Sequence, residues 1–133
     1  MFGYVVGLPW FLAYFVSGLV ILALFTTIYV YATPHRELTL IRGGNAAAVT
    51  GFLGALLGFS LPLASAATSS VSLIDFVVWA LIGMIVQVGA FFLAKGTMDD
   101  LPGRIERGEM AAGAWAGGIA LAVGLLNAAC MTY

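Results

Sequence analysis

A ridge of residues spaced four apart crosses the apolar segment from residue 72 to residue 96, and its members are Asp75, Trp79, Gly83 and Gln87. Residues four apart share one face of an α-helix. A carboxylate such as Asp75 could hold a cation or a proton at the mouth of a helical bundle. Asp75 also lies one turn from the start of the segment, where the helix dipole favours an acidic side chain and Ser72 can cap the helix. Both interpretations stay open, and we favour the capping role.

Two amide side chains lie deep in the apolar segments. Gln87 is twelve residues beyond Asp75, which is about 18 Å along a helix. A polar side chain at that depth needs a partner, and the candidates are Asn127, a threonine of residues 11–32, or Gln87 of a second copy. One interhelical hydrogen bond contributes about 0.6–2 kcal/mol, so Asn127 can be purely structural.

Small residues form a stripe on each of two apolar segments. Such stripes mark the faces where membrane helices approach closely. We therefore prefer helix packing to a binding groove, and we add Trp79 and Gly83 to the packing residues. The stripes consist of Ala47, Gly51, Gly54, Gly58, Pro62 and Ser65, and of Gly113, Ala116, Ala120, Gly124 and Asn127.

Other chemistry has little support in the sequence. His35 has no second histidine or nearby cysteine with which to hold a metal. Asp99 and Asp100 precede "LPGRI", where capping of a short helix fits better than metal binding. The single cysteine, Cys130, is explained as a small apolar filler. The sequence has no nucleophile–base pair and no phosphate-binding loop. We therefore predict that the protein has no catalytic residues, binds no metal or cofactor and is not an enzyme.

The composition is that of a membrane protein. Hydrophobic residues make up 62% of the 133 residues, charged residues 8%, and the mean hydropathy is +1.08. Soluble domains carry about 25% charged residues. The net charge of −1 argues against a nucleic-acid partner, which would need a basic face.

Four apolar runs are long enough to cross a bilayer, which takes about 20 helical residues. They cover residues 11–32, 45–63, 73–94 and 110–131. Backbone groups in lipid must be satisfied within their own segment, so the runs are predicted to be α-helices. The expected fold is an all-α, four-span membrane domain over residues 1–133, and the first run lacks the basic flank of a signal peptide.

The basic residues predict the orientation. All five lie in the connections 33–44 and 95–109, and the connection at 64–72 has no charge. The positive-inside rule places the two charged connections in the cytoplasm and both termini outside. The candidate partner-binding residues in these connections are His35, Arg36, Glu37, Arg42, Arg104 and Arg107.

The first charged connection has its own predicted structure. Thr33-Pro34 ends the first span, because proline disfavours helix in the residue before it. Leu38 and Ile41 then suit a short helix on the membrane surface. Gly43-Gly44 breaks that helix, and Asn45 is a candidate N-cap for the second span.

An internal sequence repeat suggests that the chain arose by duplication of a shorter segment. "IRGGNAAAVTGFLG" and "IERGEMAAGAWAGG" share Ile41/Ile105, Gly44/Gly108, Ala47/Ala111, Ala48/Ala112 and Gly54/Gly118 without a gap. Each copy follows a span of the same direction, so two helical hairpins would be parallel repeats about an axis along the membrane normal.

The chain also resembles a known family. The segment "YATPHRELTLIRGGNAAAVTGFLGALLGFSLPLASA", then "SLIDFVVWALIGMIVQ", and the tail from "LPGRIERGEMAAG" onward are similar to the YjfL-like family of small bacterial inner-membrane proteins, domain of unknown function 350. The resemblance implies a four-span protein of the cytoplasmic membrane. It also implies membrane-remodelling proteins of the phage-shock type or ATP-grasp ligases as partners, and it carries no catalytic residues.

Two functions follow as hypotheses. The first is a non-enzymatic membrane scaffold, a homo-oligomer in the lipid bilayer that recruits cytosolic proteins through its charged connections. The alternative is an oligomeric conduit for a small cation or polar solute, with Asp75 at the outer mouth and Gln87 and Asn127 along the path. An enzyme acting on lipid is a third and weaker hypothesis.

Overall fold

A computed structural model describes residues 3–33 and 37–131, and these form helices without strands. Four long helices are apolar enough to cross a membrane, which confirms the predicted all-α, four-span class. Two six-residue helices lie between them. The elements are α1 (Gly3–Ala32), α2 (Glu37–Arg42), α3 (Ala46–Ser69), α4 (Leu73–Thr97), α5 (Leu101–Glu106) and α6 (Met110–Ala129).

Two of the long helices extend further than the apolar runs suggested. Helix α1 begins at Gly3 and includes Pro9. Helix α3 continues through Pro62 to Ser69, so the connection to α4 is only residues 70–72 rather than 64–72. Proline lacks the N–H that would bond to the carbonyl of Gly58, but membrane helices tolerate this loss where a neighbouring helix covers the freed group. Here α6 provides that cover, since the Gly58 carbonyl faces Gly124.

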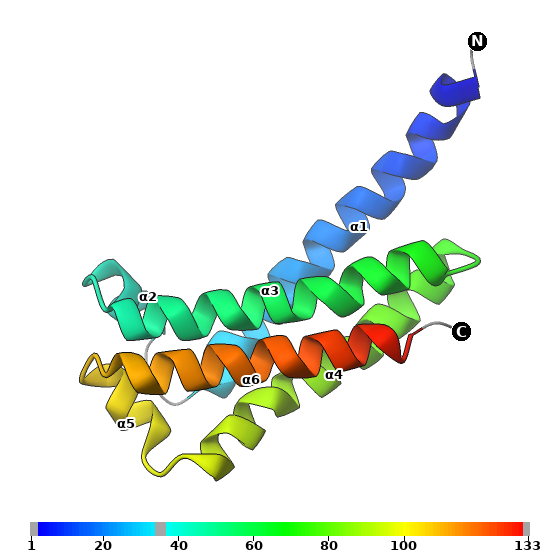
Figure 1. The fold of residues 1–133 in the computed structure, drawn as a ribbon. Helices are drawn as coiled ribbons and strands as arrows, with labels where there is room; N and C mark the ends of the chain where they lie inside the picture. The colour runs from blue at the N-terminus through cyan, green and yellow to red at the C-terminus, as the bar shows by residue number, and fades with distance from the viewer. Residues whose placement is uncertain (1–2, 34–36, 132–133) are drawn as a thin grey trace.

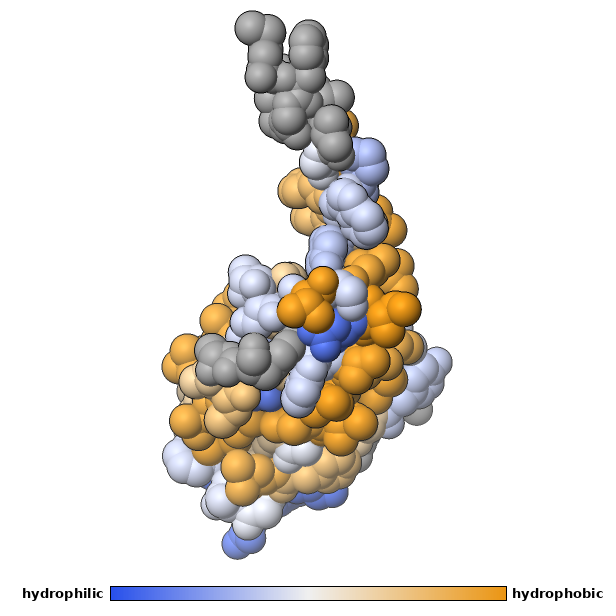
Figure 2. Space-filling view, turned by 90° about the vertical axis from the view of Figure 1, so that its right-hand side faces the viewer, coloured by the Kyte–Doolittle hydropathy of each residue, from blue (hydrophilic) through white to orange (hydrophobic). Residues whose placement is uncertain are grey.

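The helices alternate in direction, and the two short helices lie at one end of the molecule (Figure 1). Helices α3 and α6 run parallel and side by side, with α4 antiparallel to both (Figure 1). Helix α1 packs against α3 and α4, and its N-terminal part extends away from the bundle (Figures 1 and 2). The bundle therefore has a short-helix end and an opposite end formed by the α3–α4 turn.

The ends of α2 and α5 have the same backbone geometry, 64 positions apart. Helix α2 starts at 37 and α5 at 101, and α3 starts at 46 and α6 at 110. Gly44 and Gly108 follow the short helices with φ of 85° and 79°. Both turns are Schellman motifs, in which the next residue donates its N–H back to the helix. Asn45 donates to the Leu40 carbonyl at 2.9 Å, and Glu109 donates to the Arg104 carbonyl at 3.0 Å.

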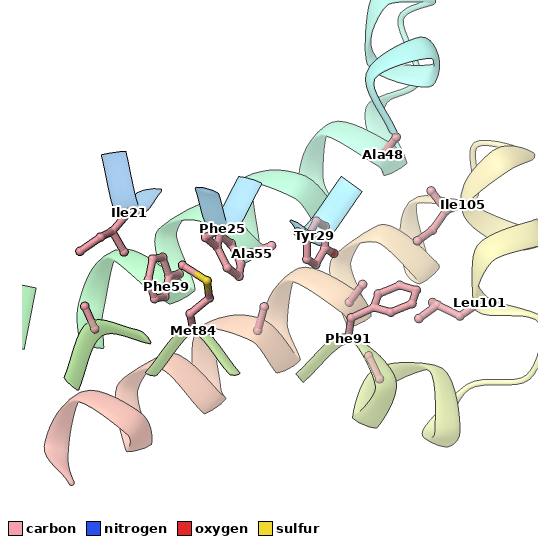
Figure 3. Close-up of a cluster of buried hydrophobic side chains, with 14 of the residues drawn as sticks. Ile21, Phe25, Tyr29, Ala48, Ala55, Phe59, Met84, Phe91, Leu101 and Ile105 are labelled. Atoms are coloured by element: carbon pink, nitrogen blue, oxygen red, sulfur yellow. The ribbon is translucent and has the colours of Figure 1, made fainter. Parts of the chain in front are cut away.

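The apolar core holds only the C-terminal half of α1. Ile21, Phe25 and Tyr29 point from α1 into a cluster with Phe59 and Met84 (Figure 3). Phe25 is fully buried, and its ring centroid lies 4.5 Å from that of Phe59. Nearer the N-terminus the large side chains of α1 are mostly exposed. Helix α1 is thus buried most fully near the short-helix end, and toward its N-terminus Tyr14 still stacks on Phe76 of α4 with ring centroids 5.5 Å apart.

Candidate functional site

Asp75 is part of a reciprocal cap at the start of α4. The Ser72 hydroxyl accepts a hydrogen bond from the Asp75 N–H at 3.1 Å. The Asp75 carboxylate accepts from the Val71 N–H, also at 3.1 Å. This arrangement satisfies two backbone donors that the helix itself leaves unpaired. The carboxylate lies at the end of the helix and is a turn-forming group in this structure.

The two intramembrane amides fasten α4 to α6 in a reciprocal way. Gln87 of α4 donates from Nε2 to the Ala120 carbonyl at 2.7 Å. Asn127 of α6 donates from Nδ2 to the Gly83 carbonyl at 3.0 Å. We call these two hydrogen bonds the amide clasp. Neither Asn127 nor a threonine is the partner of Gln87, and Thr26 and Thr27 donate to carbonyls of their own helix.

The two polar atoms of the Gln87 side chain differ in their hydrogen bonding. Gln87 is 1% exposed, and its Oε1 has no hydrogen-bond partner among the residues that the structure describes. Its Nε2 lies against Gly58, so a side chain at that position of α3 would displace it. Gln87 therefore brings a carbonyl-type acceptor into the middle of the bundle, where α3, α4 and α6 meet.

Small residues let α3 and α6 touch backbone to backbone. We call their contact the glycine seam, and it consists of Gly54, Gly58, Gly113, Gly117 and Gly124. A Cβ on Gly54 would collide with the Gly117 backbone, and one on Gly113 with the Ala47 backbone. Gly51 and Pro62 are also buried in α3, and Gly83 of α4 lies beside Pro62. Helix α6 thus covers the stripe predicted on the second span.

Trp79 lies outside the seam. It is half-buried and packs on the apolar core from α4. The four residues of the predicted ridge therefore have different surroundings. Asp75 is part of a helix cap and Trp79 contacts the apolar core. Gly83 contacts a neighbouring helix, and Gln87 forms an amide hydrogen bond.

Asn45 joins the two charged connections at the short-helix end. Its Oδ1 accepts from the Ala48 N–H at 3.0 Å, which caps α3. Its Nδ2 donates to the Ile105 carbonyl at 2.8 Å and to the Glu106 carbonyl at 3.3 Å. These carbonyls belong to the last turn of α5, where a helix leaves acceptors unpaired. One side chain thus caps α3 and closes α5.

The α5 connection carries a small ion-pair network. Arg104 pairs with Glu109 at 3.2 Å, and Arg107 pairs with Asp100 at 3.2 Å and with Glu109 at 3.4 Å. These side chains are 34–64% exposed, and exposed pairs contribute about 0–1 kcal/mol each. Asp100 occupies the N-cap position of α5, but its side chain makes no cap hydrogen bond and pairs with Arg107 instead.

The structure describes some of the remaining charged residues of the two connections. Arg42 and Lys95 are exposed. Glu37 begins α2, whereas His35 and Arg36 lie outside the described residues. No group of three His, Cys, Asp or Glu side chains in the described part of the chain is arranged to hold a metal ion.

The sequence matches a family over nearly its whole length. The model of Domain of Unknown Function (DUF350) covers residues 3–131. The chain belongs to the DUF350 family. It is also 42% identical over 123 residues to the UPF0719 inner membrane protein YjfL of Escherichia coli K12, covering 92% of this chain and 93% of that protein, and YjfL of Escherichia coli O157:H7 matches equally. No solved structure matches significantly.

This DUF350 protein is therefore a multi-pass protein of the bacterial inner membrane. Sequence reasoning missed one seam residue, Gly117, although its spacing of four from Gly113 was a usable signal. It predicted that Asn45 caps α3 but missed its second role at the end of α5. The acceptors there are backbone carbonyls, which every residue has, so the sequence does not indicate them.

Proposed function

We propose that this DUF350 protein is a non-enzymatic scaffold of the inner membrane, which recruits cytosolic proteins through one composite surface. That surface consists of α2, α5 and the charged connections around them. The observation that supports it best is the Asn45 side chain, which bonds the start of α3 to the end of α5. Two segments far apart in the sequence thereby become one surface.

Charge distribution also supports this role. Apart from Asp75, every acidic or basic residue of the described chain belongs to the short-helix end. Arg42, Glu106 and Arg107 are exposed there, so the surface presents both signs of charge. Mixed charges suit recognition of a complementary protein surface, because they set orientation and exclude wrong partners. Membrane-remodelling and ATP-grasp proteins are the first partners to test.

Orientation and duplication complete the proposal. The short-helix end faces the cytoplasm, both termini face outward, and the chain consists of two parallel hairpin repeats. The basic residues support the orientation. The equal spacing of the two Schellman turns and the common direction of α3 and α6 support the repeat.

Self-association belongs to the same proposal. The outer face of α6 carries small exposed residues, which favour close approach of a second helix. They are Ala111, Ala114, Gly118 and Ala122. A Cβ on Gly118 would meet nothing within 4 Å. Replacing Gly118 by leucine should shift the protein toward monomer in cross-linking of native membranes, and an unchanged oligomer distribution would remove this face from the proposal.

Site-specific photo-cross-linking tests the scaffold role. A photoreactive residue at Arg107 should cross-link cytosolic proteins in living cells, whereas one at Val71, exposed at the opposite end, should not. Asn45→Ala should weaken the Arg107 cross-links, because it releases α5 from α3 and costs about 1 kcal/mol of stability. Equal cross-linking from Arg107 and Val71 would contradict the proposal.

Topology has its own test. A reporter active only in the cytoplasm should function when inserted beside Gly103 and be silent after Tyr133. Cys130, exposed at the far end, should react with membrane-impermeant thiol reagents added from outside. An active reporter after Tyr133 would reverse the orientation.

The conduit alternative has one observation in its favour: the Oε1 of Gln87, in the middle of the bundle, has no hydrogen-bond partner within residues 3–33 and 37–131. Such an oxygen could transiently coordinate a cation or hold water along a path. Cation flux into proteoliposomes, abolished by Gln87→Met, would support this function. Flux that is absent, or unchanged in that variant, would exclude it.

A further inference from the structure

A cleft lies between the N-terminal half of α1 and helices α3 and α4 at the end opposite the short helices, beside the stacked rings of Tyr14 and Phe76. Its deep part has a volume of about 360 Å³ and opens between side chains of all three helices, among them Phe15, Leu19, Leu63 and Phe76. Its shallow part, about 670 Å³, is lined by Trp10, Ser72 and the turn between α3 and α4. Tyr14 lines both, so the two parts adjoin at this side chain.

Both parts of the lining are mainly apolar, and the shallow part has the larger polar share. Trp10 and Ser72 belong to the shallow part, at the level where the Ser72–Asp75 cap ends the membrane helix. In the deep part Ser60 is polar, and its hydroxyl donates to the Leu56 carbonyl of its own helix at 2.7 Å. The deep wall is therefore mainly hydrocarbon and small-residue surface, and the Ser60 hydroxyl is satisfied within α3.

The length of the cleft fits one leaflet. From Trp10 to Leu22 the lining residues of α1 span about 18 Å along the helix, against a hydrocarbon core of about 30 Å. Measured along α1, the cleft is thus slightly longer than half the thickness of that core. An opening with a few polar side chains, followed by an apolar groove of this length, suits a lipid whose acyl chain lies along α1.

The volume of the deep part argues against entry of a helix from a second copy at that level. An α-helix with its side chains is about 10 Å across, so two turns would occupy roughly 850 Å³. The deep part holds less than half of that. An acyl chain is narrow enough to enter, and the bilayer supplies it at high concentration.

We propose that this cleft is a binding site for one phospholipid of the leaflet opposite the short-helix end. An acyl chain lies in the deep part, and the headgroup lies at Trp10 and Ser72. The proposal is independent of the scaffold role and of any partner at the charged surface.

The lipid-binding proposal is tested by comparing how much lipid the wild-type protein and matched variants retain. Gly18 lines the cleft, and a Cβ there would meet only the Phe76 ring, at 3.9 Å, so Gly18→Leu fills the cleft without a backbone collision. Ala64→Phe fills it from α3. The control is Gly89→Leu, because Gly89 of α4 is exposed and a Cβ there meets nothing within 4 Å.

The full-length protein is extracted in mild detergent and examined by native mass spectrometry. Wild type and Gly89→Leu should carry one phospholipid per chain, and both cleft variants should lose at least tenfold of the lipid-bound form. Wild type without lipid, or cleft variants that retain it, would overturn the site. A dimer that only the cleft variants disrupt would instead assign the cleft to a second copy.

Cross-linking locates the lipid within the chain. A diazirine near the end of the acyl chain should label residues 15–22 or 60–67, and one on the headgroup should label residues 10–14 or 71–74. Labelling spread evenly over all lipid-facing helices would contradict the proposal, since bulk lipid produces that pattern.

Discussion

Helices α6 and α1 both pack against α3, but they do so with different chemistry. Along the glycine seam the backbones of α3 and α6 meet with no side chain between them. Helix α1 is held by large rings, with Phe25 stacked on Phe59 and, nearer the N-terminus, Tyr14 stacked on Phe76 of α4. Glycine contacts demand one close geometry along the whole helix pair, whereas side-chain contacts allow a helix to diverge and leave a cleft.

The seam should be the part most sensitive to a single added side chain. Gly54→Leu forces the new side chain against the Gly117 backbone, which has no rotamer with which to move away. We expect a loss of about 3 kcal/mol or more, at the upper end for overpacking. To measure this loss of stability, the protein is heated in detergent and the remaining monodisperse fraction is quantified by size-exclusion chromatography.

The control for the seam is Gly89→Leu, where the new side chain enters open space. It should behave as wild type in the same assay. Gly54→Ala should fall between the two, because one methyl group already meets the Gly117 backbone. Equal stability of Gly54→Leu and Gly89→Leu would show that the two helices do not need their close approach.

Removing a ring from the α1 contact should have a smaller effect. Phe25→Ala deletes a fully buried side chain, which costs roughly 3–5 kcal/mol in a soluble protein. Lipid is as apolar as the core, so the transfer part of that cost is absent in a membrane and we expect about half. Cysteine cross-linking between α3 and α6 should persist in this variant while α1 loosens. Loss of the α3–α6 cross-link would show that α1 supports the seam.

Substitutions in the amide clasp should have the smallest effects on stability. We expect these effects to differ between Asn127 and Gln87. Asn127→Leu loses one interhelical hydrogen bond, about 0.6–1.7 kcal/mol. Gln87→Met also loses a bond but removes the buried Oε1, whose unmet hydrogen bond costs about 1–3 kcal/mol, so its net effect should be near zero. Thermal melting in one detergent ranks them. If Gln87→Met is the more damaging, Oε1 has a partner in the native membrane.

The sequence predicted the class of the fold because hydropathy and length decide membrane helices directly. It also singled out the small-residue stripes, as shown by Gly54 and Gly113, since glycine spacing is visible without a structure. It did not predict the end of α3, because the effect of Pro62 depends on the helix that covers it.

Two features of the sites were beyond sequence reasoning. The acceptors for Gln87, Asn127 and Asn45 are all backbone carbonyls, which every residue has. The divergence of α1 was also hidden, because a helix that is apolar on every side does not reveal which face meets protein.

The parallel pairing of α3 with α6 also sets an order of assembly. The seam joins residues about 60 positions apart, and α4 and α5 are made between them. During synthesis the glycine face of α3 therefore enters the bilayer long before its partner exists. A chain that stops before α6 has three spans but no seam, so quality-control proteases of the membrane should meet an incomplete bundle until the last helix is inserted.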